Sequence, residues 1–87
     1  MLLSLHAKKR MSQRRISDEM IDICFNYGKI LYRSGVKLYS ITKKIVLRYN
    51  LPLEFEGVNV MVDKDDTLVI TTYKDKTEYH KFKKRSY

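Results

Sequence analysis

Residues 58–73 read VNVMVDKDDTLVITTY, and this stretch decides the fold. Its two halves are rich in β-branched residues, which favour extended strands. The polar run Lys64, Asp65 and Asp66 between them is typical of a tight turn. We therefore predict an antiparallel hairpin with strands at 58–62 and 67–73. Alternation along the second strand predicts that Val69, Thr71 and Tyr73 share one face.

Upstream of this hairpin, residues 29–41 predict a second one. Alternating apolar residues surround Ser34 and Gly35, a pair that favours a tight turn. Residues 42–57 and the tail from residue 74 are less distinct. The first segment is compatible with a strand or a short helix, and the tail with a helix or a frayed end.

Two helices are predicted before the strands. Ser4 is a suitable N-cap for a helix over 5–14, whose apolar stripe is Leu3, Ala7 and Met11. Ser17 begins a second helix with acidic residues in its first turn, and Gly28 is a natural stop. We therefore predict a single α+β domain over residues 1–87. In it, two N-terminal helices pack on one face of a four-stranded antiparallel sheet and leave the other face open.

Composition narrows the range of functions. The 87 residues carry 18 Lys and Arg against 10 Asp and Glu, a formal net charge of +8. The basic residues gather in 1–15, 29–50 and 67–87, which favours a polyanion-binding surface, although charge also serves solubility. A single cysteine excludes an internal disulfide. No segment is long and apolar enough to span a membrane, so we expect a cytoplasmic protein.

The most informative side chains are His6, Arg10 and Arg14, which recur every four residues. On a helix they form one stripe. Histidine exchanges protons near neutral pH and arginine braces phosphate, so the stripe suits phosphate chemistry. A solvated helix face would look the same. Neither a cofactor nor a metal site is predicted, because the sequence contains no suitable cluster of histidines or carboxylates.

The string Ser4-x-His6-Ala7-x-x-Arg10-Met11-x-x-Arg14-x-Ile16-Ser17 resembles the opening signature of the bacterial family called domain of unknown function 4258. The resemblance continues through residues 27–30, Gly35 and Tyr39, and ends with residues 68–74 and the basic tail over residues 81–87. That family is similar to the small ribonucleases that include barnase, colicin nucleases and RelE-type toxins. The resemblance implies a metal-independent RNA endonuclease, often the toxin of a toxin–antitoxin pair.

These features give a candidate site. The expected catalytic residues are His6, Arg10, Arg14 and Tyr73. The expected nucleic-acid contacts are Lys9, Arg33, Lys37, Thr71 and Lys74. Partners would be RNA and an acidic antitoxin, while the oligomeric state stays open. The alternative is a non-catalytic RNA-, DNA- or partner-binding module on the same fold, in which Tyr73 packs on the sheet and His6 only packs or caps a helix.

Overall fold

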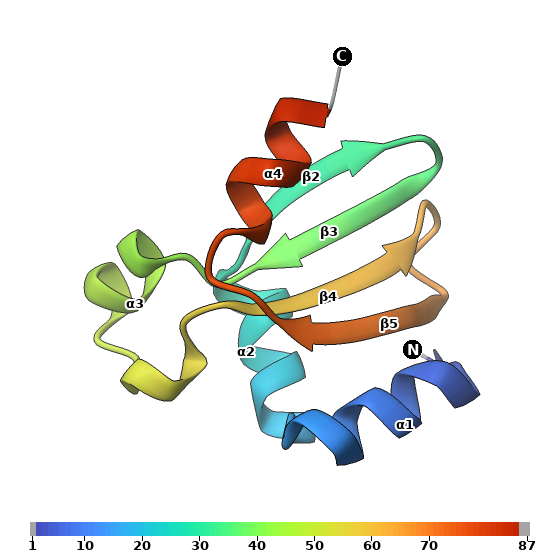
Figure 1. Ribbon diagram of the computed structural model, residues 1–87, viewed down its shortest axis with the longest axis horizontal. Coiled ribbons are helices and arrows are strands. Elements are labelled where there is room, and N and C mark those ends of the chain that lie inside the picture. Colours follow the sequence, from blue (N-terminus) through green and yellow to red (C-terminus); the bar gives the residue numbers. More distant parts are fainter. Residues whose placement is uncertain (1, 86–87) are drawn as a thin grey trace.

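The computed structural model describes residues 2–85 and has the expected α+β class (Figure 1). Helices and strands alternate irregularly along the chain. In order they are β1 (Leu2–Leu3), α1 (Leu5–Arg14), α2 (Asp18–Tyr27), β2 (Lys29–Arg33), β3 (Val36–Ser40), α3 (Lys43–Tyr49), a 3-10 turn (Leu53–Phe55), β4 (Val58–Asp63), β5 (Leu68–Lys74) and α4 (Glu78–Arg85).

The sheet has five strands in the order β1-β5-β4-β3-β2 and is mixed, so the predicted four-stranded antiparallel sheet is wrong. Both predicted hairpins are present and antiparallel. The additional strand is β1, which pairs in parallel with the start of β5. The amide of Leu2 donates to the carbonyl of Thr67 at 3.1 Å. A strand of two residues is too short to show an alternating pattern in the sequence, so it could not be predicted. It forms because the edge of β5 offers unpaired backbone groups.

A β-bulge in β5 changes which side chains share a face. Val60 pairs with Thr72, whereas Val62 pairs with Val69, so β5 contains one extra residue between these two pairs. Directly paired residues in antiparallel strands lie on the same face of the sheet. Val69 therefore lies on the core face with Val62, and it does not share a face with Thr71 and Tyr73 as strict alternation predicted.

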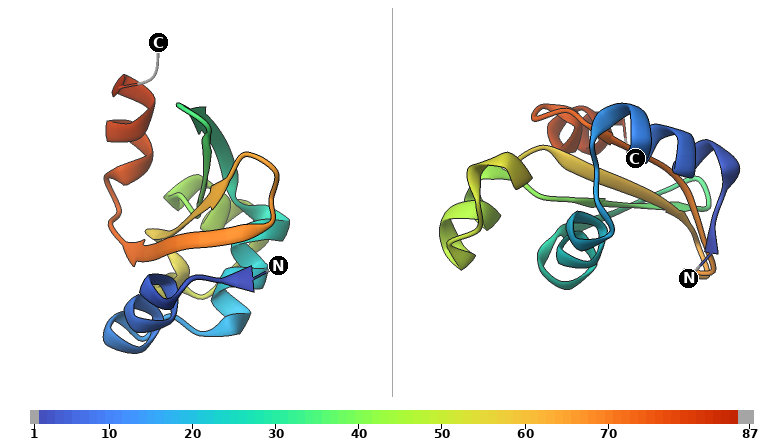
Figure 2. Two further views of the ribbon diagram at one scale, coloured as in Figure 1. Left: turned by 90° about the vertical axis from the view of Figure 1, so that its right-hand side faces the viewer. Right: turned by 90° about the horizontal axis from the view of Figure 1, so that it is seen from below.

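The two N-terminal helices do not pack on one face, which is a second correction. Helix α2 covers one face of the sheet, whereas α1 lies along β5, displaced toward the opposite face (Figure 2). The opposite face is not fully open, because α4 covers its β2 side (Figures 1 and 2). We call the side covered by α2 the core face and the other side the α4 face. The sequence pattern shows how much of a helix is apolar, not which strand it meets.

The hydrophobic core lies between α2, the core face and α1. Ala7 of α1 and Cys24 of α2 are fully buried, as are Val58, Val60 and Val62 of β4. Leu3 and Met11 pack against this cluster, which confirms the predicted apolar stripe of α1. Burial raises the pKa of the Cys24 thiol, and this residue is a structural thiol that donates to the carbonyl of Tyr39 at 3.3 Å.

Helix ends follow the sequence closely. Ser4 and Ser17 are N-caps as predicted, and their hydroxyls accept from the amides of Ala7 and Met20. Gly28 ends α2, although its φ of −68° is open to any residue. Its requirement for glycine is spatial, because a Cβ there would lie 2.5 Å from the carbonyl oxygen of Cys24. The uncertain segment at 42–57 contains α3, which Thr42 caps, and the 3-10 turn.

A buried polar residue fixes the chain at the end of β5. Asn59 is fully buried on the α4 face, where it pairs with Ser40 and Tyr73. Its amide nitrogen donates to the carbonyls of Gly57 at 2.8 Å and Asp75 at 3.1 Å, and its oxygen accepts from Ser40 at 2.6 Å. All of its polar atoms are thus satisfied, and the turn that follows β5 is held against the sheet.

Candidate functional site

Helix α1 and strand β5 enclose a shallow hollow of about 250 Å³. It contains residues from the two ends of the sequence. Its lining consists of His6, Arg10, Arg14, Thr71, Tyr73, Lys74 and Asp75. The four residues expected to be catalytic therefore lie in one place, together with two of the expected nucleic-acid contacts. We call this the α1–β5 hollow.

The position of α1 depends on Ser4. Its hydroxyl accepts from the amide of Ala7 at 2.9 Å and donates to the carbonyl of Ile70 at 2.7 Å. The backbone amide of Ser4 also donates to the carbonyl of Val69 at 3.0 Å. With Ala7 buried in the core, this attachment sets the rotation of the helix, and the stripe that begins at His6 then lines the hollow.

The strand side of the hollow depends on the bulge. Thr71 and Tyr73 pair with Met61 and Asn59, so both belong to the α4 face. Val69, before the bulge, turns into the core. One extra residue therefore allows β5 to contribute to the core at its start and to the hollow at its end. Bulges often re-aim side chains next to functional sites.

The polar contacts within the hollow are loose. Arg10 Nε donates to His6 Nε2 at 3.4 Å, and Arg10 Nη1 donates to Gln13 Oε1 at 3.5 Å. Both contacts are near the long limit of a hydrogen bond. Arg10 can therefore exchange them for a phosphate oxygen and leave His6 Nε2 able to take a proton.

Asp75 is the one acidic residue in the lining, and the sequence interpretation missed it. Its carboxylate accepts from the hydroxyl of Thr77 at 2.7 Å, from the amide of Thr77 at 2.9 Å and from Lys81 Nζ at 3.0 Å. The Thr77 hydroxyl, the Thr77 amide and then Lys81 lower the pKa of Asp75 to about 2. The Asp-x-Thr pattern at 75–77 is the signal that could have predicted this turn. The carboxylate is ionised, but its oxygens are engaged on the α4 side.

Three other expected nucleic-acid contacts do not join the hollow. Lys9 is exposed on α1 outside the lining. Arg33 ends β2, the strand at the far edge of the sheet. Lys37 forms a salt bridge with Asp66. The hydrogen bond within this ion pair raises the pKa of Lys37. Lys37 also pairs with Val62 and so lies on the core face.

The described residues provide neither a metal site nor a membrane-spanning helix. Within residues 2–85, no group of three or more histidine, cysteine, aspartate or glutamate side chains is arranged to hold a metal ion. Over the same part of the chain, none of the helices combines the length and the apolar character needed to cross a membrane.

Fold and hollow together define a small basic α+β domain with a histidine–arginine site at the edge of a mixed sheet. The chain belongs to the family described as Domain of unknown function (DUF4258), whose model matches residues 3–74. This match includes every lining residue of the hollow except Asp75. No curated protein and no solved structure matches the chain.

Proposed function

We propose that this protein is a toxin-type RNA endonuclease that cleaves RNA by attack of a ribose 2′-hydroxyl, without a metal ion. The observation that carries the proposal is the convergence of His6, Arg10 and Arg14 with Thr71, Tyr73 and Lys74 around one hollow. The similarity to barnase, colicin nucleases and RelE-type toxins that we expect of the family would favour the same chemistry. A similar fold alone would not be enough for this proposal, because one fold can host many functions.

In this mechanism His6 removes the proton of the 2′-hydroxyl through Nε2, once Arg10 has turned to the phosphate. The 2′-oxygen then bonds to phosphorus and the bond from phosphorus to the 5′-oxygen breaks. Arg10 and Arg14 stabilise the charge that develops on the phosphate oxygens. The products are a 2′,3′-cyclic phosphate and a 5′-hydroxyl end.

The leaving 5′-oxygen needs a proton, and the strand side of the hollow supplies the donor. Tyr73 has a phenolic hydroxyl, and its ring offers a surface for a base. Thr71 contributes a second hydroxyl on the same strand, and Lys74 adds positive charge at the end of β5. We assign proton donation to Tyr73 and positioning of the RNA to Thr71 and Lys74.

The charge of the chain bears on its partners. A net charge of +8 attracts RNA and also favours an acidic protein inhibitor, the antitoxin of the pair. A toxin that acts on cellular RNA works in the cytoplasm. Accordingly, a small acidic protein encoded beside this chain is the expected partner.

A non-catalytic RNA-binding module is the second candidate, and one observation favours it. His6 is the only imidazole that lines the hollow among the described residues, and general acid–base cleavage requires two proton carriers. If Tyr73 does not donate a proton, the hollow binds RNA without cleaving it. Such a module would show salt-dependent RNA binding and intact RNA.

The deciding experiment incubates the purified protein, free of any partner, with total RNA in the presence of EDTA, and separately with ribosome-bound mRNA in a Mg²⁺ buffer that keeps the ribosome assembled. We expect fragments that end in a 2′,3′-cyclic phosphate. Binding without fragments on either substrate would favour the binding module. If the protein neither binds nor cleaves RNA, and its induction does not slow growth, both candidates are wrong.

A further inference from the structure

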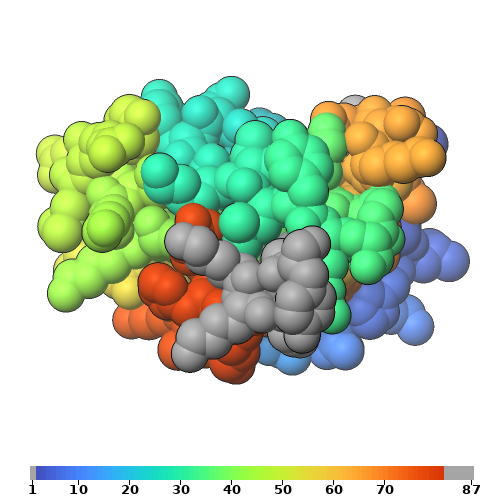
Figure 3. Space-filling view, turned by 90° about the horizontal axis from the view of Figure 1, so that it is seen from above, coloured from blue at the N-terminus to red at the C-terminus, as the bar shows by residue number. Residues whose placement is uncertain are grey.

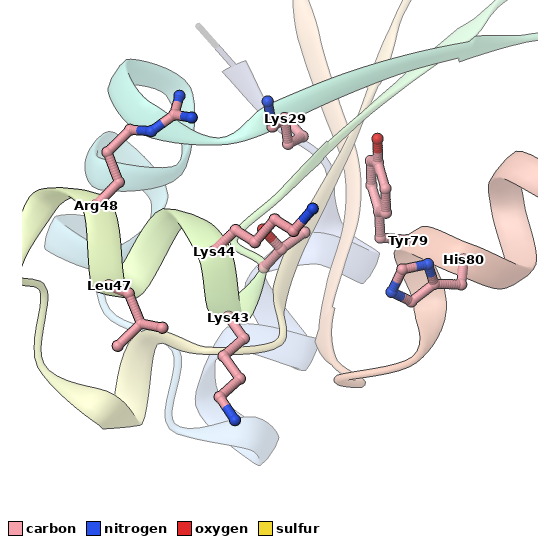
Figure 4. Close-up of a pocket in the computed structure, with 8 residues that line it drawn as sticks. Lys29, Lys43, Lys44, Leu47, Arg48, Tyr79 and His80 are labelled. Atoms are coloured by element: carbon pink, nitrogen blue, oxygen red, sulfur yellow. The ribbon is translucent and has the colours of Figure 1, made fainter.

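A second and larger hollow lies on the other side of the 75–77 turn. It measures about 550 Å³ and is enclosed by α3, the start of β2 and the start of α4 (Figure 4). Its lining consists of Lys29, Thr42, Lys43, Lys44, Leu47, Arg48, Tyr79 and His80. We call it the α3–α4 hollow. Figure 3 shows α4 at the surface, with α3 on one side of it and α1 on the other.

The lining contains four lysine and arginine side chains and no carboxylate. In Figure 4, Lys44 extends from α3 toward Tyr79 and His80, and Lys29 lies on β2, above Lys44 in this view. Lys43 and Arg48 lie farther out, at the rim (Figure 4). The salt bridges found within residues 2–85 engage Lys37 and Lys81, not these four cations. Their charge is therefore available to an anion from outside.

The aromatic side chain distinguishes a nucleotide from other anions. Tyr79 is half-buried, and its ring lies 5.4 Å from that of His80 in an edge arrangement. Cations beside an aromatic ring are the combination with which proteins bind single-stranded nucleic acid, since phosphates meet the charges and bases stack on the ring. An acidic peptide would use the charges but not the ring.

The two hollows adjoin the same short segment of the chain, residues 74–80. The α1–β5 hollow ends at Lys74 and Asp75, and the α3–α4 hollow begins at Tyr79. Between them lies the turn at 75–77, held by Asn59 and carrying the exposed Lys76. A strand of RNA that leaves the first hollow would therefore cross this turn, where Lys76 is exposed, before it reaches the second hollow.

We infer that the α3–α4 hollow is a second nucleotide-binding subsite, with a phosphate on Lys29 and Lys44 and a base on Tyr79. This inference rests on the proposed function, because it takes the nucleotide to be part of the RNA bound at the α1–β5 hollow. It assigns a role to the segment that contains α3 and to α4, which lies outside the family match.

The first test is an NMR titration of the His6→Ala protein with a single-stranded oligouridylate of about ten nucleotides. We expect shifts at Lys29, Lys44 and Tyr79 as well as along α1 and β5. Shifts confined to α1 and β5 would overturn this inference and leave the proposed function standing. Shifts confined to α3 and α4 would contradict both, because the inference takes the nucleotide to be part of RNA that is also bound at the α1–β5 hollow. No shifts, or tighter binding of oligoglutamate at the same residues, would also overturn the inference.

Affinity measurements with the same RNA give a second test. Lys29→Ala with Lys44→Ala removes both lysines from one phosphate and should lower the salt dependence of binding by about 0.7 in log K against log [salt], at about 0.7 per phosphate contact. Lys8→Ala with Lys64→Ala removes the same charge elsewhere and should not lower it by that amount. Tyr79→Ala should weaken binding about 5- to 100-fold, and Tyr79→Phe should not. The subsite would be contradicted if the two double lysine variants changed the salt dependence equally. It would also be contradicted if Tyr79→Ala left the RNA affinity unchanged.

Discussion

The Ser4 hydroxyl donates to the carbonyl oxygen of Ile70 at 2.7 Å, across 66 positions in the sequence. The same hydroxyl caps α1 by accepting from the amide of Ala7. Ile70 lies between Val69, which turns into the core, and Thr71, which lines the hollow. One side chain thus fixes the first turn of the helix to the bulged strand. The two walls of the α1–β5 hollow meet at this contact.

Replacing Ser4 by alanine should destabilise the protein by about 1–2 kcal/mol, because a cap and a tertiary hydrogen bond are lost together. Ser17→Ala is the matched control, since Ser17 caps α2 by accepting from the amide of Met20 at 3.2 Å. Urea unfolding measures both. Only Ser4→Ala should also increase hydrogen exchange in α1 and reduce RNA affinity. Equal behaviour of the two variants would show that the Ile70 contact does not position the helix.

Arg10 and Arg14 should act through the shape of their guanidinium groups. Arg14→Lys keeps the charge but loses the paired donors that match a phosphate, so we expect RNA cleavage to fall about tenfold or more. Arg10→Lys should act in the same way and also lose the contact with His6 Nε2. The control is Lys8→Arg, an exposed substitution outside the lining. Full activity in both lysine variants would mean that the arginines supply charge alone.

Asn59 should be among the most sensitive polar positions. Asn59→Ala leaves the Ser40 hydroxyl and the carbonyls of Gly57 and Asp75 without their side-chain partner in a fully buried place. We expect a loss of about 2–3 kcal/mol in the free energy of unfolding. Asn26→Ala, on the exposed surface of α2, should change it by less than about 0.5 kcal/mol. A small effect at Asn59 would show that the 75–77 turn is held by other contacts.

Stability in acid should depend on Asp75. Its pKa in the folded protein is lowered to about 2, chiefly by the Thr77 hydroxyl, so its ionised form stabilises the fold. That contribution is complete above the ordinary aspartate value of about 3.9 and is lost as the pH falls toward 2. Asp63, whose pKa is lowered first by the Thr67 hydroxyl, contributes in the same direction.

Thr77→Ala should therefore make stability less dependent on pH between about 4 and 2, whereas Thr77→Ser should keep the dependence of the natural protein. Denaturant unfolding at several pH values measures the difference. If Thr77→Ala and Thr77→Ser follow the same curve, the Thr77 hydroxyl does not control the ionisation of Asp75.

Local sequence signals predicted most of the secondary structure. The caps at Ser4 and Ser17 begin helices as expected, and both hairpins are where turn residues separate β-branched runs. The errors concern assembly. A two-residue strand, a bulge at one position and the choice of the β5 edge by α1 all depend on contacts between distant segments. No local pattern encodes such contacts.

The candidate site was also predictable only in part, because local spacing predicts a helix face but not the contacts between distant segments. Spacing of four residues placed His6, Arg10 and Arg14 on one helix face, and the structure brings that face to Tyr73. Lys37 does not join the hollow, because it lies on the core face and forms a salt bridge with Asp66 of another hairpin. The α3–α4 hollow was missed because it lies between two segments with no clear pattern, and His80 had the pattern of a plain surface residue.

The most direct test of the account is the rate of RNA cleavage by His6→Ala under single-turnover conditions, with RNA affinity measured in parallel. If His6 removes the 2′-hydroxyl proton, the rate should fall by about 10²- to 10⁴-fold while the affinity changes little. Lys8→Ala, one exposed residue outside the hollow, should cleave at the rate of the natural protein. An unchanged rate in His6→Ala would contradict the assignment of the α1–β5 hollow as the site of cleavage.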